Sequence, residues 1–369
     1  MSDQIRWMTG TDNIEPNLSI IVGRCESVTL RIVSTPASVG IITTPECVGV
    51  AFQRQLSTAI RTVVRELRRF GKCETPNDVL YILRGGLNFD LHASLSESNY
   101  LLPEVSFISS QRVESGAGFS IGENSYSKWN IQDCATLWVG DIVATGITLQ
   151  TSIAQAIAEY ERQAKHCREV IVITIGTGNV INAARSIAAN LKSISGDIVE
   201  NIHVIFLEGM FTLFTGEPQL TSTHLAYTDL IRKRAPRSVE LEFETFKQTS
   251  ALFERCAIYD GGSRSFEPRL YLSNLQRYWS SLLEIGRGMS TRTFMSMVSD
   301  ADVYQLSFQE WLKAVPWWSC SMPSAQLKEL YDFGRSVFDM LTNTSLTAIC
   351  EQRLAQLEVS ACAATLASR

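Results

Sequence analysis

A short turn between an apolar segment and an amphipathic one carries the residue types best suited to bind a phosphate. Residues 135–139 are mostly apolar, Asp141 follows them, and a helical pattern covers residues 148–165. The turn between them reads Ala144, Thr145, Gly146, Ile147 and Thr148. Successive backbone N–H groups and two hydroxyls at a helix N-terminus favour a phosphate dianion, and Gly146 lets the backbone approach without a Cβ. Asp141, at the carboxyl end of the expected strand, could reach sugar hydroxyls beside that phosphate.

A second turn upstream has a basic residue and two glycines after an apolar segment. Arg84, Gly85 and Gly86 follow the apolar residues 79–83, which are expected to form a strand. Residues 111–130, between the two turns, are polar and rich in glycine. This stretch offers Arg112 and Lys128 as cations.

The two turns, in this order, resemble those of type I phosphoribosyltransferases. Asp141, Thr145, Gly146 and Thr148 match the family's loop for 5-phosphoribosyl 1-pyrophosphate (PRPP), in which an apolar strand and acidic residues precede Thr-Gly-x-Thr. The turn at residues 84–86 is similar to the family's pyrophosphate loop. The resemblance covers roughly residues 25–210.

The resemblance implies a role for each of these segments. The loop from Ala144 through Ile147 to Thr148 would bind the 5′-phosphate, and Asp141 would hold the ribose hydroxyls as a catalytic residue. Arg84 and the backbone of Gly85 and Gly86 would bind pyrophosphate. The family carries a mobile flap between the two loops, and residues 111–130 stand in its place. This flap would close with Arg112 or Lys128 as a catalytic cation. Mg²⁺ would be bound mainly through PRPP, with no dedicated protein metal site, and the chain would form a homodimer.

Two positions depart from the family pattern. Gly140 occupies the place of the first acidic residue, which leaves Asp141 alone to hold the ribose. Ala144 stands where the 6-oxopurine enzymes of the family carry an acid that acts on the base. The second departure argues against hypoxanthine or guanine as the acceptor and leaves adenine-like, pyrimidine-like and non-nucleobase acceptors open.

The rest of the chain predicts an α/β domain followed by a helical region. The 369 residues are more than one compact domain usually takes. Strand and helix patterns alternate up to about residue 210, and continuous apolar strands suit a parallel sheet covered on both faces. We expect a Rossmann-like parallel sheet of the type I phosphoribosyltransferase kind in residues 1–220 and a mostly helical extension in residues 221–369. Residues 38–44 are interpreted as strand, and residues 45–71 as a helix.

Composition narrows the function classes. The net charge of −5 excludes a generally basic nucleic-acid binder, so the basic face formed by Arg61, Arg65, Arg68 and Arg69 is interpreted as solvated. No apolar run approaches the roughly 18 residues of a membrane helix, and the N-terminus lacks a secretory pattern. A cytoplasmic location is therefore expected. The nine cysteines show no zinc spacing and are interpreted as reduced, mostly buried thiols.

Three further segments have ordinary structural interpretations. Gly176, Thr177 and Gly178 precede a helix that Asn179 is expected to cap, although a second phosphate turn is conceivable. Residues 260–267 read as a tight turn with a surface ion pair, although a loop over the acceptor is an alternative. The aromatic residues 317 and 318 are interpreted as core or interface.

Together these features favour an enzyme that transfers the 5-phosphoribosyl group of PRPP to an unidentified small-molecule acceptor with release of pyrophosphate. The alternative is a non-catalytic PRPP- or nucleotide-binding regulatory or effector module. Such a module would act on a protein partner through the C-terminal half.

Overall fold

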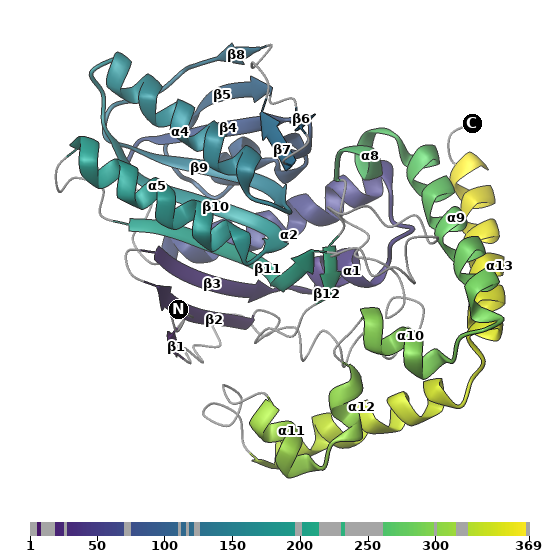
Figure 1. Cartoon of the computed structure of the whole chain (residues 1–369). Helices are drawn as coiled ribbons and strands as arrows, with labels where there is room; N and C mark the ends of the chain where they lie inside the picture. The colour runs from purple at the N-terminus through teal and green to yellow at the C-terminus, as the bar shows by residue number, and fades with distance from the viewer. Residues whose placement is uncertain are drawn as a thin grey trace. The chain divides into compact units, whose positions relative to one another are not determined.

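A ten-stranded sheet forms the framework of the N-terminal half of the chain (Figure 1). The computed structural model describes residues 6–8, 19–25, 28–69, 75–109, 112–115, 118–121, 126–195, 201–213, 230–232, 261–298, 301–314 and 324–366. The chain divides into two compact units that interleave along the sequence. The first comprises Met1–Val39, Gln53–Gly209 and Asp260–Gly262, and the second comprises Gly40–Phe52, Met210–Tyr259 and Ser263–Arg369.

The strand order of the sheet is β1-β2-β3-β11-β10-β9-β4-β5-β8. The bounds are β1 (Arg6–Met8), β2 (Ser19–Cys25), β3 (Val28–Ser34), β4 (Asn77–Leu83), β5 (Glu104–Ser109), β8 (Ser127–Lys128), β9 (Ala135–Val143), β10 (Cys167–Thr177) and β11 (Asn201–Leu213). Strands β3 and β11 pair in parallel, as do β10 with β9, β9 with β4, and β4 with β5. The pairs β1–β2, β2–β3 and β5–β8 are antiparallel. The last strand, β12 (Leu230–Arg232), pairs with the end of β11.

Helices cover both faces of this sheet, which explains why its central strands are apolar throughout. Helices α4 (Ile147–Arg162) and α5 (Asn179–Ser195) lie on one face, and α2 (Gly49–Arg69) crosses the other (Figure 1). Strand β10 is buried along nearly its whole length. The α/β prediction is therefore confirmed.

Residues 38–44, expected as strand, are instead helical. Helix α1 (Pro36–Thr43) begins with a reciprocal cap, in which Thr35 N donates to Ser38 Oγ over 2.9 Å and Ser38 N donates to Thr35 Oγ1 over 3.0 Å. Pro36 at the first helical position supplies a favourable φ. These capping contacts outweigh the β-branched character of the segment. The following helix, α2, begins at Gly49 rather than at Pro45, and its expected glycine stop at residue 71 lies outside the described residues.

The expected flap contains a hairpin. Strands β6 (Arg112–Ser115) and β7 (Gly118–Ile121) pair antiparallel as a separate two-stranded sheet. Upstream of it, the 3₁₀ helix η1 (Gly85–Phe89) and helix α3 (Leu91–Glu97) join β4 to β5.

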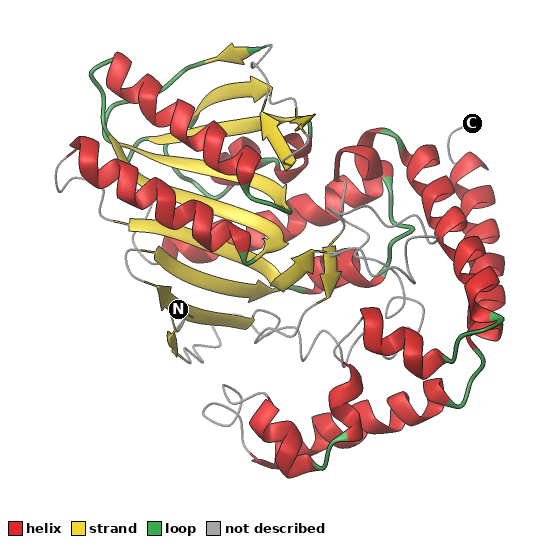
Figure 2. Cartoon of the chain, in the orientation of Figure 1, coloured by secondary structure: helices red, strands yellow, loops and turns green. Residues whose placement is uncertain are grey.

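The second unit is largely helical in its described residues (Figure 2). Its elements are α8 (Gly261–Phe266), α9 (Pro268–Gly286), α10 (Thr291–Val298), η3 (Ala301–Gln305), α11 (Phe308–Ala314), α12 (Ser324–Thr342) and α13 (Leu346–Leu366). Helices α9 and α13 lie side by side, and an aromatic-rich core that includes Tyr278, Trp279 and Trp311 is almost fully buried. This agrees with the helical C-terminal region expected from the sequence.

The segment at residues 260–267 differs from the surface turn expected for it. Arg264 in α8 is fully buried, and its guanidinium donates hydrogen bonds to the backbone oxygens of Ile41, Thr44 and Cys47. It also lies 4.5 Å from the ring centroid of Phe52. A buried guanidinium needs several acceptors to offset the loss of its hydration, and carbonyls in the last turn of α1 and directly after it supply them in place of a surface ion pair.

Two of the sequence-based expectations concern residues outside the described part of the chain. The boundary expected at residue 220 falls within 214–229, and residues 317 and 318 fall within 315–323, so both lie outside the described part. Within the part of the chain that the structure describes, the helices are too short or too polar to cross a bilayer.

Candidate functional site

The turn at residues 84–86 lies against the end of β9, the strand that leads into the turn at residues 144–148. Strands β4 and β9 are parallel neighbours, so the loops after them meet at the same edge. A Cβ added at Gly85 would lie 3.0 Å from Asp141 Oδ1, and one added at Gly86 would lie 3.1 Å from the backbone oxygen of Gly140. The carboxylate of Asp141 therefore lies beside the glycine turn that follows Arg84, and the lack of side chains there permits this close approach.

At position 140, where the family has its first acidic residue, the structure leaves no space for a side chain. A Cβ on Gly140 would lie 2.5 Å from Cγ and 2.6 Å from Cβ of Phe89. Phe89 is fully buried at the end of η1, so its ring cannot yield easily. A larger residue at position 140 would require the η1 segment to shift, and this leaves Asp141 as the acidic residue of the β9 terminus.

The turn at residues 144–148, called the phosphate turn below, contains a glycine with a positive φ. Gly146 has φ of +84° and precedes the first residue of α4, which is a helix of 16 residues. Thr148 is buried, Thr145 is half-buried and Ile147 is exposed. The turn thus presents the N-terminus of a full-length helix, where unsatisfied N–H groups and the helix dipole favour an anion.

Residues 177–179, in the turn after β10, form hydrogen bonds with the phosphate turn. Thr177 Oγ1 donates to the backbone oxygen of Ala144 over 2.5 Å, and Asn179 Nδ2 donates to the same oxygen over 3.2 Å. A Cβ on Gly146 would lie 3.2 Å from the Asn179 backbone oxygen. The backbone N–H of Asn179 donates to the Thr177 hydroxyl over 3.2 Å. The expected cap by the Asn179 side chain is therefore wrong, because that side chain holds the phosphate turn while Thr177 accepts the N–H.

The Arg84 turn is fixed by contacts around η1 and α3. The Leu83–Arg84 peptide is cis, and Asp90 has φ of +48°. Ser57 Oγ donates to Asp90 Oδ2 over 3.0 Å, which connects α2 to this segment. The Tyr81 hydroxyl lies 2.7 Å from His92 Nδ1, and burial raises the pKa of Tyr81 to about 12.

Part of the basic face of α2 also contributes to this anchoring. Arg61 forms an ion pair with Glu97 at 3.0 Å and another with Asp90 at 3.7 Å. Arg68 donates to the backbone oxygen of Ser98 over 2.9 Å. These two arginines bind the segment around α3, so the interpretation of the whole face as solvated was wrong for them. The sequence pattern did not reveal this, because Asp90 and Glu97 lie 29 and 36 residues beyond Arg61.

The two flap cations lie on strands of two different sheets. Arg112 begins β6, where it pairs with Ile121. Lys128 is exposed in β8 and pairs with Phe107 of β5. Their catalytic role stays a prediction from the sequence, as does pyrophosphate binding by Arg84, which is exposed.

Comparisons with known proteins bear on this arrangement. No family model and no curated protein sequence matches the chain. Solved structures do match. Part of the chain is similar in fold to solved phosphoribosyltransferases. Similar structures include a hypoxanthine-guanine phosphoribosyltransferase from Bacillus anthracis (18% identity, 34% of this chain and 67% of that chain, TM-score 0.24) and a purine phosphoribosyltransferase from Pyrococcus horikoshii (16%, 41% and 83%, 0.24). The AQ2163 protein from Aquifex aeolicus matches at 14% identity over 54% of this chain and 91% of that chain, with a TM-score of 0.38.

Proposed function

We propose that this chain binds PRPP and transfers its 5-phosphoribosyl group to a small-molecule acceptor. The observation that supports this most directly is the position of Asp141 near the end of β9, where its Oδ1 would lie 3.0 Å from a Cβ added at Gly85. PRPP carries a phosphate at one end of its ribose and pyrophosphate at the other. A site for it needs a phosphate turn, a carboxylate for the sugar and a second anion-binding turn. The proposal is supported by the position of Asp141, which lies beside the turn at residues 84–86 on the strand that leads into the turn at residues 144–148.

Each part of the site has a proposed role. The N–H groups of the turn at residues 144–148 and the hydroxyls of Thr145 and Thr148 bind the 5′-phosphate. Asp141 accepts hydrogen bonds from the ribose hydroxyls. Arg84 and the open backbone of Gly85 and Gly86 bind pyrophosphate, and the flap with Arg112 or Lys128 closes over the bound ligand to exclude water.

Mg²⁺ fits this set of residues. Magnesium is commonly held by one or two carboxylates together with substrate phosphates, and Asp141 provides one carboxylate facing the proposed pyrophosphate turn. The ion would neutralise charge on the leaving pyrophosphate when bound.

The reaction that follows is a substitution at the anomeric carbon. The bond from that carbon to the pyrophosphate oxygen breaks, and pyrophosphate leaves with the electron pair. The acceptor's lone pair forms the new bond, and the acceptor loses a proton where it carries one. Because the transition state has oxocarbenium character, the residues contribute by positioning the reactants and by stabilising the leaving anion. Ala144 at the place of the family's purine-directed acid favours an acceptor other than hypoxanthine or guanine.

Calorimetric titration with PRPP and Mg²⁺ tests the assignment on wild type, Asp141→Asn and a matched surface control, Asp339→Asn. Asp339 lies on α12, 4.0 Å from Arg335, and about half of its side chain is exposed. We expect Asp141→Asn to weaken binding at least tenfold, because a charged hydrogen bond contributes about 1.5–3 kcal/mol, and Asp339→Asn to bind as wild type does. Absence of binding by wild type, or equal binding by Asp141→Asn, would reject the site.

A second candidate function, binding without turnover, is favoured by the position of Phe89, whose Cγ would lie 2.5 Å from a Cβ added at Gly140. This position leaves no room for the acid that would share the ribose with Asp141. Pyrophosphate release should therefore be followed with adenine-like, pyrimidine-like and non-nucleobase acceptors. Release with any of them supports transfer, whereas PRPP binding with none supports a sensing module.

A further inference from the structure

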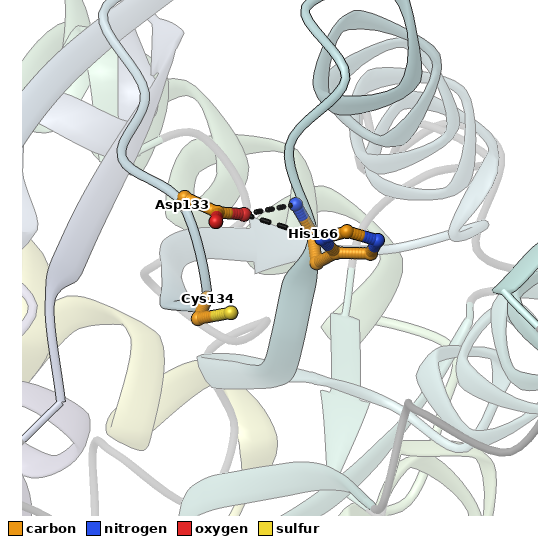
Figure 3. A group of neighbouring side chains, drawn as sticks. All are labelled: Asp133, Cys134 and His166. Atoms are coloured by element: carbon orange, nitrogen blue, oxygen red, sulfur yellow. Dashed lines mark hydrogen bonds and ion pairs between the residues drawn. The ribbon is translucent and has the colours of Figure 1, made fainter.

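Three metal-ligating side chains meet at the edge of the sheet opposite the candidate site. Asp133 and Cys134 directly precede β9, and His166 directly precedes β10 (Figure 3). Strands β9 and β10 are parallel neighbours, and their pairing begins at Cys167 with Ala135. The three residues therefore flank the first residue pair of these strands. The phosphate turn follows the other end of β9, so this cluster is separate from the proposed PRPP site.

The donor atoms of this cluster are a carboxylate oxygen, a thiol sulfur and an imidazole nitrogen, and they all lie within 4.8 Å of one another. Carboxylate, thiolate and imidazole together suit Zn²⁺, whereas Mg²⁺ and Ca²⁺ prefer oxygen donors alone. We propose that Asp133, Cys134 and His166 form a Zn²⁺ site with three protein ligands and a fourth position for water.

The spacing of two donors already matches a tetrahedral zinc. Asp133 Oδ1 and His166 Nδ1 lie 3.2 Å apart, and two ligands at zinc distances of about 2.0–2.1 Å in a tetrahedral arrangement are about 3.3 Å apart. The Cys134 sulfur needs to approach these atoms to roughly 3.6 Å by the same geometry. Rotation about its Cα–Cβ bond can provide such a movement because the side chain is exposed.

The backbone brings the two loops together before any ion binds. The backbone N–H of His166 donates to Asp133 Oδ1 over 2.8 Å, and Lys165 Nζ donates to the Ile131 backbone oxygen over 2.5 Å. Cys134 and Ala164 have positive φ angles of 52° and 53°, which an L-residue adopts only where its surroundings enforce it. In the zinc complex, Nδ1 of His166 directs its lone pair at the ion, the ring proton resides on Nε2, and Cys134 binds as the thiolate.

Thiol alkylation of the full chain, read peptide by peptide by mass spectrometry, tests the site with Zn²⁺ as the probe. We expect Zn²⁺ to slow alkylation of Cys134 at least tenfold and to leave Cys47, which is half-buried elsewhere, unchanged. His166→Ala and Asp133→Asn should each weaken the protection at least tenfold, because even the indirect partners of metal ligands commonly contribute 10–100-fold to affinity.

A second measurement uses Co²⁺ in place of Zn²⁺. Binding should produce a thiolate-to-metal charge-transfer band that Cys134→Ser abolishes and Cys47→Ser keeps. Far-ultraviolet circular dichroism of each variant checks that the fold is retained. Unchanged alkylation of Cys134 at about 100 μM Zn²⁺, or protection that persists in His166→Ala, would overturn the proposal. A cobalt band that survives in Cys134→Ser would overturn it too.

Discussion

Gly146 is the residue at which the phosphate turn has the least conformational freedom. Its φ of +84° and the 3.2 Å between an added Cβ and the Asn179 backbone oxygen make alanine unfavourable for two reasons. We expect Gly146→Ala to lower the free energy of unfolding of the first unit by about 1–3 kcal/mol and to weaken PRPP binding. Urea unfolding and calorimetry measure the two effects.

Gly178 provides a matched control for this substitution. It lies two residues after Gly176 in the neighbouring turn, and an added Cβ there would meet no atom within 4 Å. Gly178→Ala should therefore leave both PRPP binding and unfolding close to wild type. If the two substitutions change PRPP binding and the free energy of unfolding equally, the positive φ and close packing of Gly146 are not the cause of the effects.

At this scale the sequence predicts the residues of the two turns but not their neighbours. The spacing of Asp141, Gly146 and Thr148 is local, so it can be read along the chain. Phe89, which occupies the space beside Gly140, and Asn179, which holds Ala144, act over tertiary distances. The sequence offered no signal for Phe89, whereas the Thr177–Asn179 turn was noticed and interpreted as a helix cap, with a second phosphate turn as the alternative.

The turn that follows β10 supports the turn that follows β9, and this relation between elements is open to test. Asn179→Ala removes the 3.2 Å hydrogen bond to the Ala144 backbone oxygen. We expect PRPP affinity to fall several-fold, with about 1 kcal/mol lost from stability, because the loop that presents its N–H groups becomes less ordered. Calorimetry and urea unfolding provide the measurements.

Gln150→Ala serves as the comparison for Asn179→Ala. Gln150 Nε2 donates to Ser186 Oγ over 2.9 Å and so connects α4 to α5 with a bond of the same kind. Its loss should cost similar stability while PRPP affinity stays at the wild-type value. If the two variants bind PRPP equally well, the hydrogen bond from Asn179 does not contribute to PRPP affinity.

In the second unit, the turn before α2 is joined to α13 by an ion pair that should respond to pH. Arg353 donates to both carboxylate oxygens of Glu46, at 3.2 and 2.8 Å, and its side chain is almost fully buried. Burial alone would raise the pKa of Glu46, but the hydrogen bond and charge of Arg353 outweigh it, so the pKa lies below the ordinary value of 4.5. The stabilisation is therefore complete above about pH 4.5 and is lost as the pH falls through the lowered value.

Glu46→Gln should accordingly destabilise the second unit by about 2 kcal/mol at pH 7, with a smaller difference from wild type near pH 3.5. Hydrogen exchange of α13 amides in urea measures this. Asp332→Asn, which disrupts the exposed pair with Lys328, should have little effect at either pH. A Glu46→Gln deficit that is the same at both pH values would contradict the assignment.

Among the elements, several strands and the long amphipathic helices were read correctly, whereas the short helix α1 was not. The amphipathic pattern of α4 and the apolar runs of β10 and β11 are long enough to predict their type. Residues 38–44 were misread because eight residues of helix depend on a cap at Thr35 and Ser38 rather than on periodicity. The buried Arg264 was misread as well, because its carbonyl partners lie more than 200 residues away along the chain.

For the whole molecule, the interleaving of the two units predicts that the first 220 residues do not form an intact folded fragment. Residues 40–52 belong to the second unit, where Arg264 and Arg353 bind them. In a chain ending at residue 220 these partners are missing. We expect amides of residues 40–52 to exchange at least tenfold faster there than in the full chain.

Residues 79–82 of β4 are the internal reference for this measurement. They are buried in the central sheet of the first unit, and they should stay protected in both chains if the sheet forms without the second unit. Full protection of residues 40–52 in the shorter chain would contradict the expectation. The boundary expected at residue 220 came from a change from alternating strand and helix patterns to mostly helical ones. Such local patterns do not show that a segment of thirteen residues belongs with a region 200 residues later.

The division of helix α2 between the two units has a consequence for the evolution of the gene. Its first residues, Gly49 to Phe52, belong to one unit and the remainder to the other. Recombination exchanges contiguous stretches of coding sequence, so no single crossover could deliver either unit complete to another protein. We therefore expect relatives of this chain to carry both the helical region and the sheet, or to show a rebuilt segment in place of residues 40–52.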